Sequence, residues 1–324
     1  MAVTVYMGRS AWVGAGEESV WGTAVSRTHY FRVISTALRR KVNKVGRPHL
    51  AQGTASGMRR SHFTQSDNVE GDIEMEMAYE GFGLWLKHAL MGTPATTGPV
   101  SSIYTHTYKL AQTVTPGLTI EQAFGIADDS TVRSEIFEGC SINSLRVRVA
   151  AGEVARLGVS IIGETSATRA SAGSPTHTTN DVPMLHNQAG AMTFNSVSYT
   201  VKSMEITLEN NLSRRMLLGS TNTKQPMRGD FAMVKMKVAL ELSDDNLITA
   251  TTADTQGDVA CTFTGLASRT STWTVSNAFI TDYSDPVNNA GIIERTVEFT
   301  GESNGTNEGL QFAIANLQTT ATAA

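Results

Sequence analysis

The side chains most able to do chemistry are scattered along this sequence of 324 residues. No two histidines have the H-x-x-x-H spacing of a zinc site, and neither cysteine belongs to a C-x-x-C pair. The G-x-S-x-G, P-loop and Rossmann glycine patterns are also missing. We therefore expect no enzyme, no metal and no cofactor. The histidines are His29, His49, His62, His88, His106, His177 and His186.

Three short acidic clusters could bind a proton or a cation. Glu17-Glu18 and Asp128-Asp129 lie in turn-like segments, where solvated turn residues are a better interpretation than a general acid–base pair. The cluster at 244–246, Asp-Asp-Asn, could touch calcium, but it lacks the rest of an EF-hand loop. A helix N-cap explains it better.

One charge pattern does suggest a function. In V-E-G-D-I-E-M-E-M, Val69 to Met77, strict alternation predicts a strand with one buried and one wet face. Four carboxylates on one face repel each other, but a closed ring of such strands would line a channel with negative potential. DNA would pass that wall without adhering. An ordinary solvated face is an equal alternative, and Lys235 and Lys237 weaken a uniformly acidic wall. The candidate lumen residues are Glu70, Asp72, Glu74 and Glu76.

A basic loop, 46–63, precedes this strand. Its Arg47, Arg59 and Arg60 could bind nucleic acid, meet an acidic patch on a neighbouring subunit, or simply be solvated. No aromatic residues interleave with them as in a nucleic-acid platform. We therefore favour the contact with another subunit.

The overall composition is that of a soluble β protein. The net charge is −4, hydrophobic residues make up 40% and charged residues only 17%, which argues against a nucleic-acid reader. Cys140 and Cys261 are too few for a disulfide framework and indicate free thiols in a reducing compartment. We see no signal peptide and no apolar run that could span a membrane, so we expect synthesis in the cytoplasm without export.

Strand-like segments cover most of the chain. A helix is predicted by an apolar stripe that Gly92 and Pro94 would end. Glu164 to Pro183 indicates a loop or linker. The Gly-rich start indicates an extended arm whose tryptophans pack on the body or on another subunit. The stripe is Phe82, Trp85, Leu86, Ala89 and Leu90; the strand candidates are 31–45, 69–77, 118–124, 142–149, 154–162, 198–208, 231–242, 259–264, 272–280, 292–300 and 310–314.

Two matches indicate an internal duplication. Residues 69–75, V-E-G-D-I-E-M, resemble 227–233, M-R-G-D-F-A-M, with their G-D pairs 158 residues apart. Residues 152–164 resemble 291–302, with their final G-E pairs 138 residues apart. The order of elements also repeats, which places a second helix near Asp244 to Ala253. Chance is the alternative, because alternating strands look alike.

Several segments, taken in order, resemble the tail tube proteins of long, flexible-tailed bacteriophages. In the first half they are G-A-G-E-E-S-V-W-G-T (14–23), P-G-L-T-I-E-Q-A-F (116–124) and F-E-G-C-S-I-N-S-L-R-V-R-V (137–149) with the G-E-V strand after it. In the second half they are V-K-S-M-E-I-T-L-E-N-N-L (201–212), L-G-S (218–220) and R-G-D-F-A-M-V-K-M-K-V (228–238). The likeness covers most of the chain.

The resemblance implies a mainly β protein, built from a β-sandwich or β-barrel tube module with a flanking short helix and duplicated within the chain. We expect an arm at 1–30, modules at 31–165 and 191–324, and a linker at 166–190, with 163–190 as a candidate outward insertion. Sheets of neighbouring copies would join edge to edge, since closing a ring removes open edges. Inter-ring contacts would come from an arm containing Trp12, Glu17, Glu18 and Trp21.

Such rings would stack into the virion tail tube, assembled in the host cytoplasm, which conducts the genome. Three duplicated chains, or six if the duplication is illusory, would form a ring. A tape-measure protein and tail-tip or terminator proteins would be partners, and DNA would pass without specific binding. Alternatives are a distal tail or decoration protein, a carbohydrate-binding β-sandwich, against which the scattered aromatics count, and an enzyme with a pocket assembled from distant residues.

Overall fold

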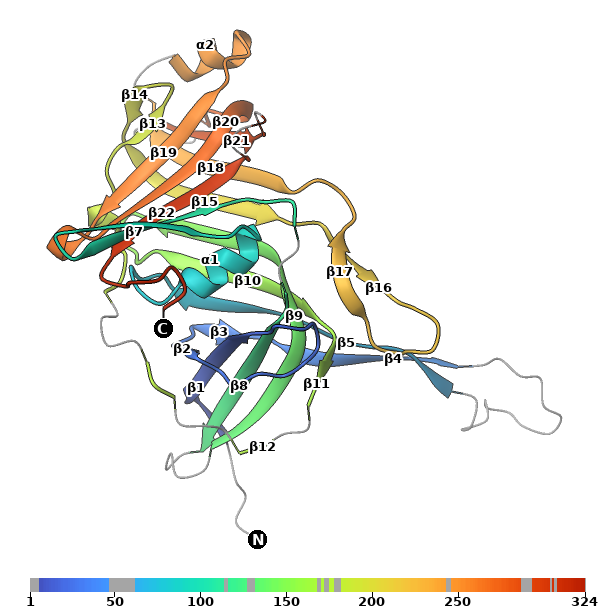
Figure 1. Cartoon of the computed structure of the whole chain (residues 1–324). Helices are drawn as coiled ribbons and strands as arrows, with labels where there is room; N and C mark the ends of the chain where they lie inside the picture. The colour runs from blue at the N-terminus through green and yellow to red at the C-terminus, as the bar shows by residue number, and fades with distance from the viewer. Residues whose placement is uncertain are drawn as a thin grey trace.

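The fold is mainly β, as predicted, and includes two short α-helices (Figure 1). The computed structural model describes residues 6–46, 62–113, 116–126, 132–167, 170–171, 175–177, 182–242, 246–286, 293–303, 305 and 308–323. Within these residues the strands form one large antiparallel network, and the separate hairpin β16–β17 stands beside it. The described strands do not close into a barrel within one chain.

The first half of the chain contains twelve of the strands and helix α1. Each predicted strand of this half is present, although 31–45 is divided into short pieces. In order the elements are β1 (Tyr6–Glu17), β2 (His29–Phe31), β3 (Ser35–Thr36), β4 (Arg39–Gly46), β5 (His62–Glu76), α1 (Gly83–Leu90), β6 (Ala95–Val100), β7 (Ile103–Lys109), β8 (Leu118–Ile126), β9 (Val132–Ala150), β10 (Arg156–Gly163), β11 (Thr165–Ser166) and β12 (Ala170–Ser171).

The second half contains the other strands and α2, which lies where the duplication predicted a helix. In order they are η1 (His186–Gln188), β13 (Met192–Phe194), β14 (Val197–Tyr199), β15 (Val201–Glu209), β16 (Leu212–Arg215), β17 (Lys224–Arg228), β18 (Met233–Glu241), α2 (Asn246–Thr252), β19 (Gly257–Thr264), η2 (Leu266–Ser268), β20 (Thr270–Ser284), β21 (Glu294–Gly301) and β22 (Leu310–Asn316).

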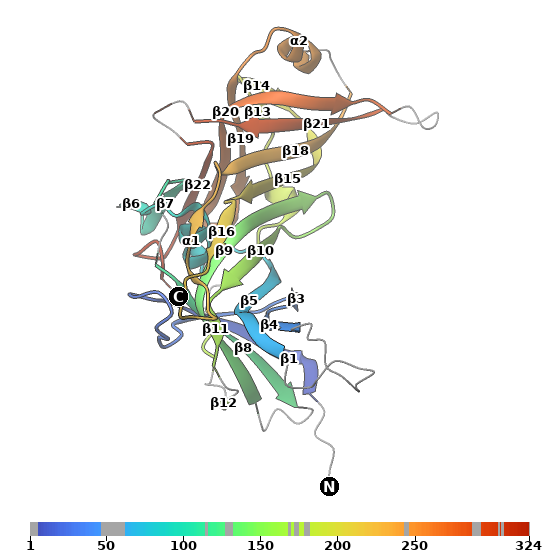
Figure 2. The same cartoon turned by 90° about the vertical axis from the view of Figure 1, so that its right-hand side faces the viewer.

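A long sheet runs through both halves of the molecule. Its neighbours, in order, are β4, β5, β10, β9, β15, β18, β21 and the second half of β20. Figure 2 shows these strands following one another from β5 to β21. The pair β9–β15 joins the two halves, so the chain forms one continuous sheet across the centre of the molecule.

A second layer covers one face of the long sheet. The first half of β9 pairs with β8, which pairs with β1, while the first half of β20 lies between β19 and β22. β9 and β20 therefore belong to both layers. Each contains a residue with left-handed backbone near the change, Gly139 (φ 60°) and Asn277 (φ 48°). Such irregularities let a strand pass from one sheet to another.

The core fills the space between the layers. In β10 burial alternates strictly, and in β5 the buried residues are the apolar ones, including Val69, Ile73 and Met75. α1 contacts both β9 and β7, so it is buried on nearly every side, with only Lys87 partly exposed. The predicted single stripe was therefore too narrow. The helix ends at Met91, which adopts the left-handed conformation (φ 60°), just before the predicted Gly92.

Candidate assembly surface

The face of the long sheet turned away from the core is charged. One lateral row crosses seven strands, with each member directly opposite the next. From β5 to β20 the row is Glu76, Arg156, Arg148, Glu205, Lys237, Glu298 and Asp282. Acidic and basic side chains thus alternate irregularly across the whole width of the sheet.

The predicted acidic residues lie on this face, among basic side chains. Asp72 and Glu76 are exposed, while Glu70 and Glu74 are half-buried. Glu74 lies 3.5 Å from Arg156 and 3.9 Å from Arg148. These arginines come from β10 and β9, so the face is not uniformly acidic. That it faces a lumen stays a prediction.

Glu70 is the most heavily paired of the four carboxylates. Its oxygens lie 2.9 Å from both Arg39 and Lys41 on β4, and 3.6 Å from Arg214 on β16. Partial burial acts to raise the pKa of Glu70, but the hydrogen bonds from Lys41 and Arg39 outweigh it, so the pKa lies below its usual value. Glu70 thus stays ionised and ties the edge strand β4 to β5.

Charge pairing continues in the second half of the sheet. Lys235 on β18 donates to Glu298 on β21 at 2.7 Å, and this hydrogen bond raises the pKa of Lys235. At the junction of the two halves, Arg146 on β9 donates to Glu205 on β15 at 2.5 Å. Adjacent strands of the sheet are therefore linked by ion pairs on this face as well as by backbone hydrogen bonds.

The long sheet has two open edges. Within the described residues, β3–β4 pairs with β5 on one side only, and the stretch 278–284 of β20 pairs only with β21. Side chains on both edges are exposed, Arg39 to Lys44 on β4 and 281–284 on β20. An unpaired edge is a template for another strand. The β4 edge is basic and the β20 edge contains Asp282 and Asp285.

The four predicted arm residues are brought together by the structure, at the first strand and the turn after it. Trp12 is buried and contacts Tyr30 edge-to-face, with ring centroids 5.3 Å apart. Glu17 pairs with Lys87 of α1 at 2.6 Å, and Trp21 is half-buried. Within a single chain this segment is a strand paired with β8, although the sequence suggested an extended arm. Its inter-ring role stays a prediction.

Glu18 differs from its neighbour because it is buried. Its carboxylate accepts hydrogen bonds from the backbone N–H of Gly22 and Gly139 and from the Thr119 hydroxyl, each at 2.9 Å. Burial raises the pKa of Glu18, and these hydrogen bonds partly offset the rise. The side chain thus fixes the turn after β1 against β8 and β9.

The predicted basic loop residues Arg47, Arg59 and Arg60 lie outside the described residues. An exposed apolar surface that sequence reasoning missed lies on the β16–β17 hairpin. Leu218 at its tip is fully exposed, beside partly exposed Met216 and Leu217. The run M-L-L among polar residues was the signal that could have revealed it.

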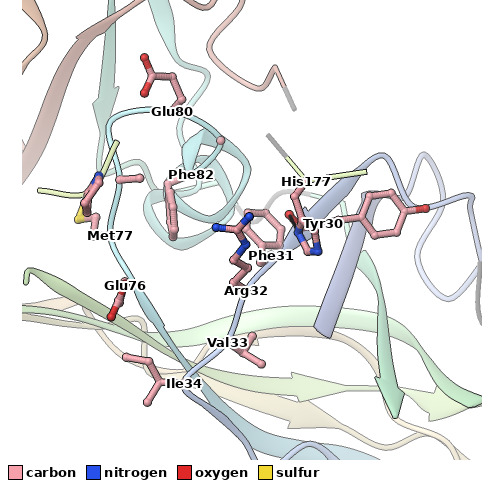
Figure 3. Close-up of a pocket in the computed structure, with 13 residues that line it drawn as sticks. Tyr30, Phe31, Arg32, Val33, Ile34, Glu76, Met77, Glu80, Phe82 and His177 are labelled. Carbon is pink, nitrogen blue, oxygen red and sulfur yellow. Dashed lines mark hydrogen bonds between the residues drawn. The ribbon is translucent and has the colours of Figure 1, made fainter. Parts of the chain in front are cut away.

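A half-open cavity of about 410 Å³ lies beside α1 and is mostly lined by apolar and aromatic side chains (Figure 3). In Figure 3 its two carboxylates, Glu76 and Glu80, point away from each other. Glu80 forms a buried ion pair with Arg269. The lining therefore does not bring two carboxylates together as an acid–base pair would require.

Two searches of the described part of the chain gave negative results. No group of three or more His, Cys, Asp or Glu side chains there could hold a metal ion. No helix there is long and apolar enough to cross a membrane.

Comparison with known proteins identifies the family. A family model described as phage tail tube protein matches residues 8–301, which is most of the chain. This is a family of structural proteins and not of enzymes. No curated protein matches the chain.

Proposed function

The chain belongs to the phage tail tube family, and from that premise we propose that its copies form rings that stack into a tail tube of the long, flexible type. The tube is a component of the virion tail, assembled in the host cytoplasm, and conducts the genome into the host. The observation that carries the proposal is the long sheet, which has one apolar face, one charged face and two open edges.

The charged face suits a channel wall. Barrels of 16–18 strands already leave an aqueous channel. Three copies contributing eight strands each would give about 24 strands and a wider lumen. Cations on this face, such as Arg146 and Lys235, already pair with carboxylates. Passing phosphates would therefore find few unpaired charges and would slide without specific binding.

We further propose that the chain contains two tube modules, 31–165 and 191–324, joined by a linker at 166–190. The pairing of β5 with β10 and of β18 with β21 supports this division, because each pair follows a helix-containing or hairpin connection in the same order. Two modules per chain favour three copies in a ring over six. The segment 1–30 would contribute to contacts between rings, and a tape-measure protein and tail-tip or terminator proteins would act as partners.

Negative-stain electron microscopy of the concentrated protein, with and without a tail-tip complex as initiator, tests this function. Hollow tubes or stacked rings are the expected result, and end-on views would count the copies. A single ring that never stacks, or a closed shell, would contradict the proposal and favour a distal tail or decoration protein.

A further inference from the structure

We infer that, in the ring, the free half of β20 in one copy pairs antiparallel with β3–β4 of the next copy, with Asp282 directly opposite Lys41. The inference rests on the proposed ring assembly and goes beyond it, because it names the two strands and their register. Its basis is the junction already present inside the chain, where β9 of the first half pairs with β15 of the second.

The internal junction has a defined register. Leu145 lies opposite Leu208, Val147 opposite Ile206, and Ser144 opposite Glu209. The apolar pairs are buried and face the core, while the charged pair Arg146–Glu205 lies on the opposite face. A junction between copies that follows this pattern would continue both faces without interruption.

β20 corresponds to β9 with a shift of 138 residues. β9 has an unpaired residue between Ile142 and Ser144 in its ladder with β10, and β20 has one between Ile280 and Asp282 in its ladder with β21. The ladders with β8 and β19 are also interrupted at matching places. Gly139 and Asn277, the two left-handed residues, differ by the same shift. Such irregularities specify register more sharply than the alternation of side chains does.

β3–β4 corresponds in the same way to β15, with a shift of 168 residues. Val69 of β5 lies opposite Gly163, just as Val234 of β18 lies opposite Gly301. On the far side of these strands, Ser35 lies opposite Glu74 and Arg39 opposite Glu70. The matching pairs in the second half are Ser203–Ala239 and Thr207–Lys235.

Applying both shifts to the internal junction gives the register between copies. The pair Ser144–Glu209 becomes Asp282–Lys41, and the next pairs are Tyr283–Arg40 and Ser284–Arg39. Asp282 and Lys41 are both exposed and opposite in charge. Lys41 currently reaches Glu70 on its own sheet, so Asp282 would add a second carboxylate to an existing ion pair.

The same register satisfies the geometry of a closed barrel. The charged row that starts at Glu76 reaches Lys237 on β18 after four strands. Lys237 corresponds to Asp72, so the row descends four residues along the strand over four strands. Barrels with a shear of one residue per strand tilt their strands by about 36°, within the usual range of about 35–45°. The pair Asp282–Lys41 continues this descent, because Lys41 faces Asn68.

Cysteine cross-linking of the full chain tests the register. The variant Asp282→Cys with Lys41→Cys places two thiols opposite each other at a separation suited to a disulfide. The matched control is Asp282→Cys with Lys44→Cys, which moves one thiol about 10 Å along β4, beyond disulfide reach. Cys140 and Cys261 are both buried and therefore give little background.

Mild oxidation should convert the first variant into a covalent ladder and the control at least tenfold less. The largest circular member of the ladder also counts the copies in a ring. A folded variant that forms no cross-link, or a control that cross-links equally well, would overturn the register. Wild-type protein imaged in parallel separates the two ideas, because tubes without the cross-link refute only the register, whereas no tubes refute the proposed function.

Discussion

At the scale of single residues, Glu17 and Glu18 show how burial separates two neighbours of the same type. The sequence gives them one acidic pair in a turn. In the structure Glu17 reaches Lys87 at the surface, whereas Glu18 is buried and accepts three hydrogen bonds. Their spacing in the sequence could not reveal this, since the donors of Thr119 and Gly139 come from distant strands.

The two glutamates should therefore differ in their effect on stability. Glu18→Ala leaves buried donors without an acceptor, and we expect the free energy of unfolding to fall by about 2–3 kcal/mol. Glu17→Ala removes a partly exposed ion pair and should cost about 1 kcal/mol or less. Urea denaturation of both variants measures the difference, and equal losses would contradict the assigned role of Glu18.

His88 gives a prediction about pH. Burial lowers the pKa of His88 to about 4 in the folded chain, below its ordinary value of 6.5. Protonation then favours the unfolded state, so this contribution is complete above pH 6.5 and is lost as the pH falls toward 4. The loss should reach about 3 kcal/mol at about 1.4 kcal/mol per pKa unit.

The variant His88→Gln removes this titration and serves as the comparison. Between pH 6.5 and 4 the wild-type unfolding midpoint should fall more steeply than that of the variant. Parallel curves for the two proteins would show that His88 is not buried in its neutral form.

At the scale of elements, alternation of apolar and polar residues predicted the strands that have one face on the core. It missed β1, because its run of small residues gives no clear period. Gly16 sits so close to Ser26 that an added Cβ would lie 2.5 Å from the Ser26 carbonyl oxygen. β6–β7 and β16–β17 were missed because most of their residues are exposed or polar.

The candidate surface was predicted only in part. The acidic row of β5 follows from its own alternation, but its partners Arg148 and Arg156 lie on strands far along the chain. Which strands pair depends on tertiary structure, so the sequence alone suggested an acidic wall where the sheet has a mixed one. The open edges are likewise a property of the assembled sheet.

The two layer-crossing strands give a prediction at this scale. Both Gly139 and Asn277 have left-handed backbone, so an alanine at either position should cost about 1 kcal/mol. At Gly139 an added Cβ would also lie 2.9 Å from Trp21 and Glu164, so Gly139→Ala should be the more damaging. Asn277→Gly should be nearly neutral. Thermal unfolding of the three variants checks this order, and a harmless Gly139→Ala would contradict it.

At the scale of the whole molecule, one chain presents a sheet whose two edges match its own internal junction. The apolar face is already covered by the second layer and α1. The charged face and the edges are therefore what a single chain leaves for assembly. A ring that continues the sheet would remove both edges, which a lone copy leaves open to aggregation.

Reconstruction of assembled tubes by electron cryo-microscopy tests the central claim most directly. We expect a ring of three copies with six similar modules, a lumen walled by the long sheet, and Glu76, Arg148 and Lys237 directed into the channel. A lumen walled instead by the second layer, or rings in which the long sheets of neighbouring copies do not touch, would contradict this account.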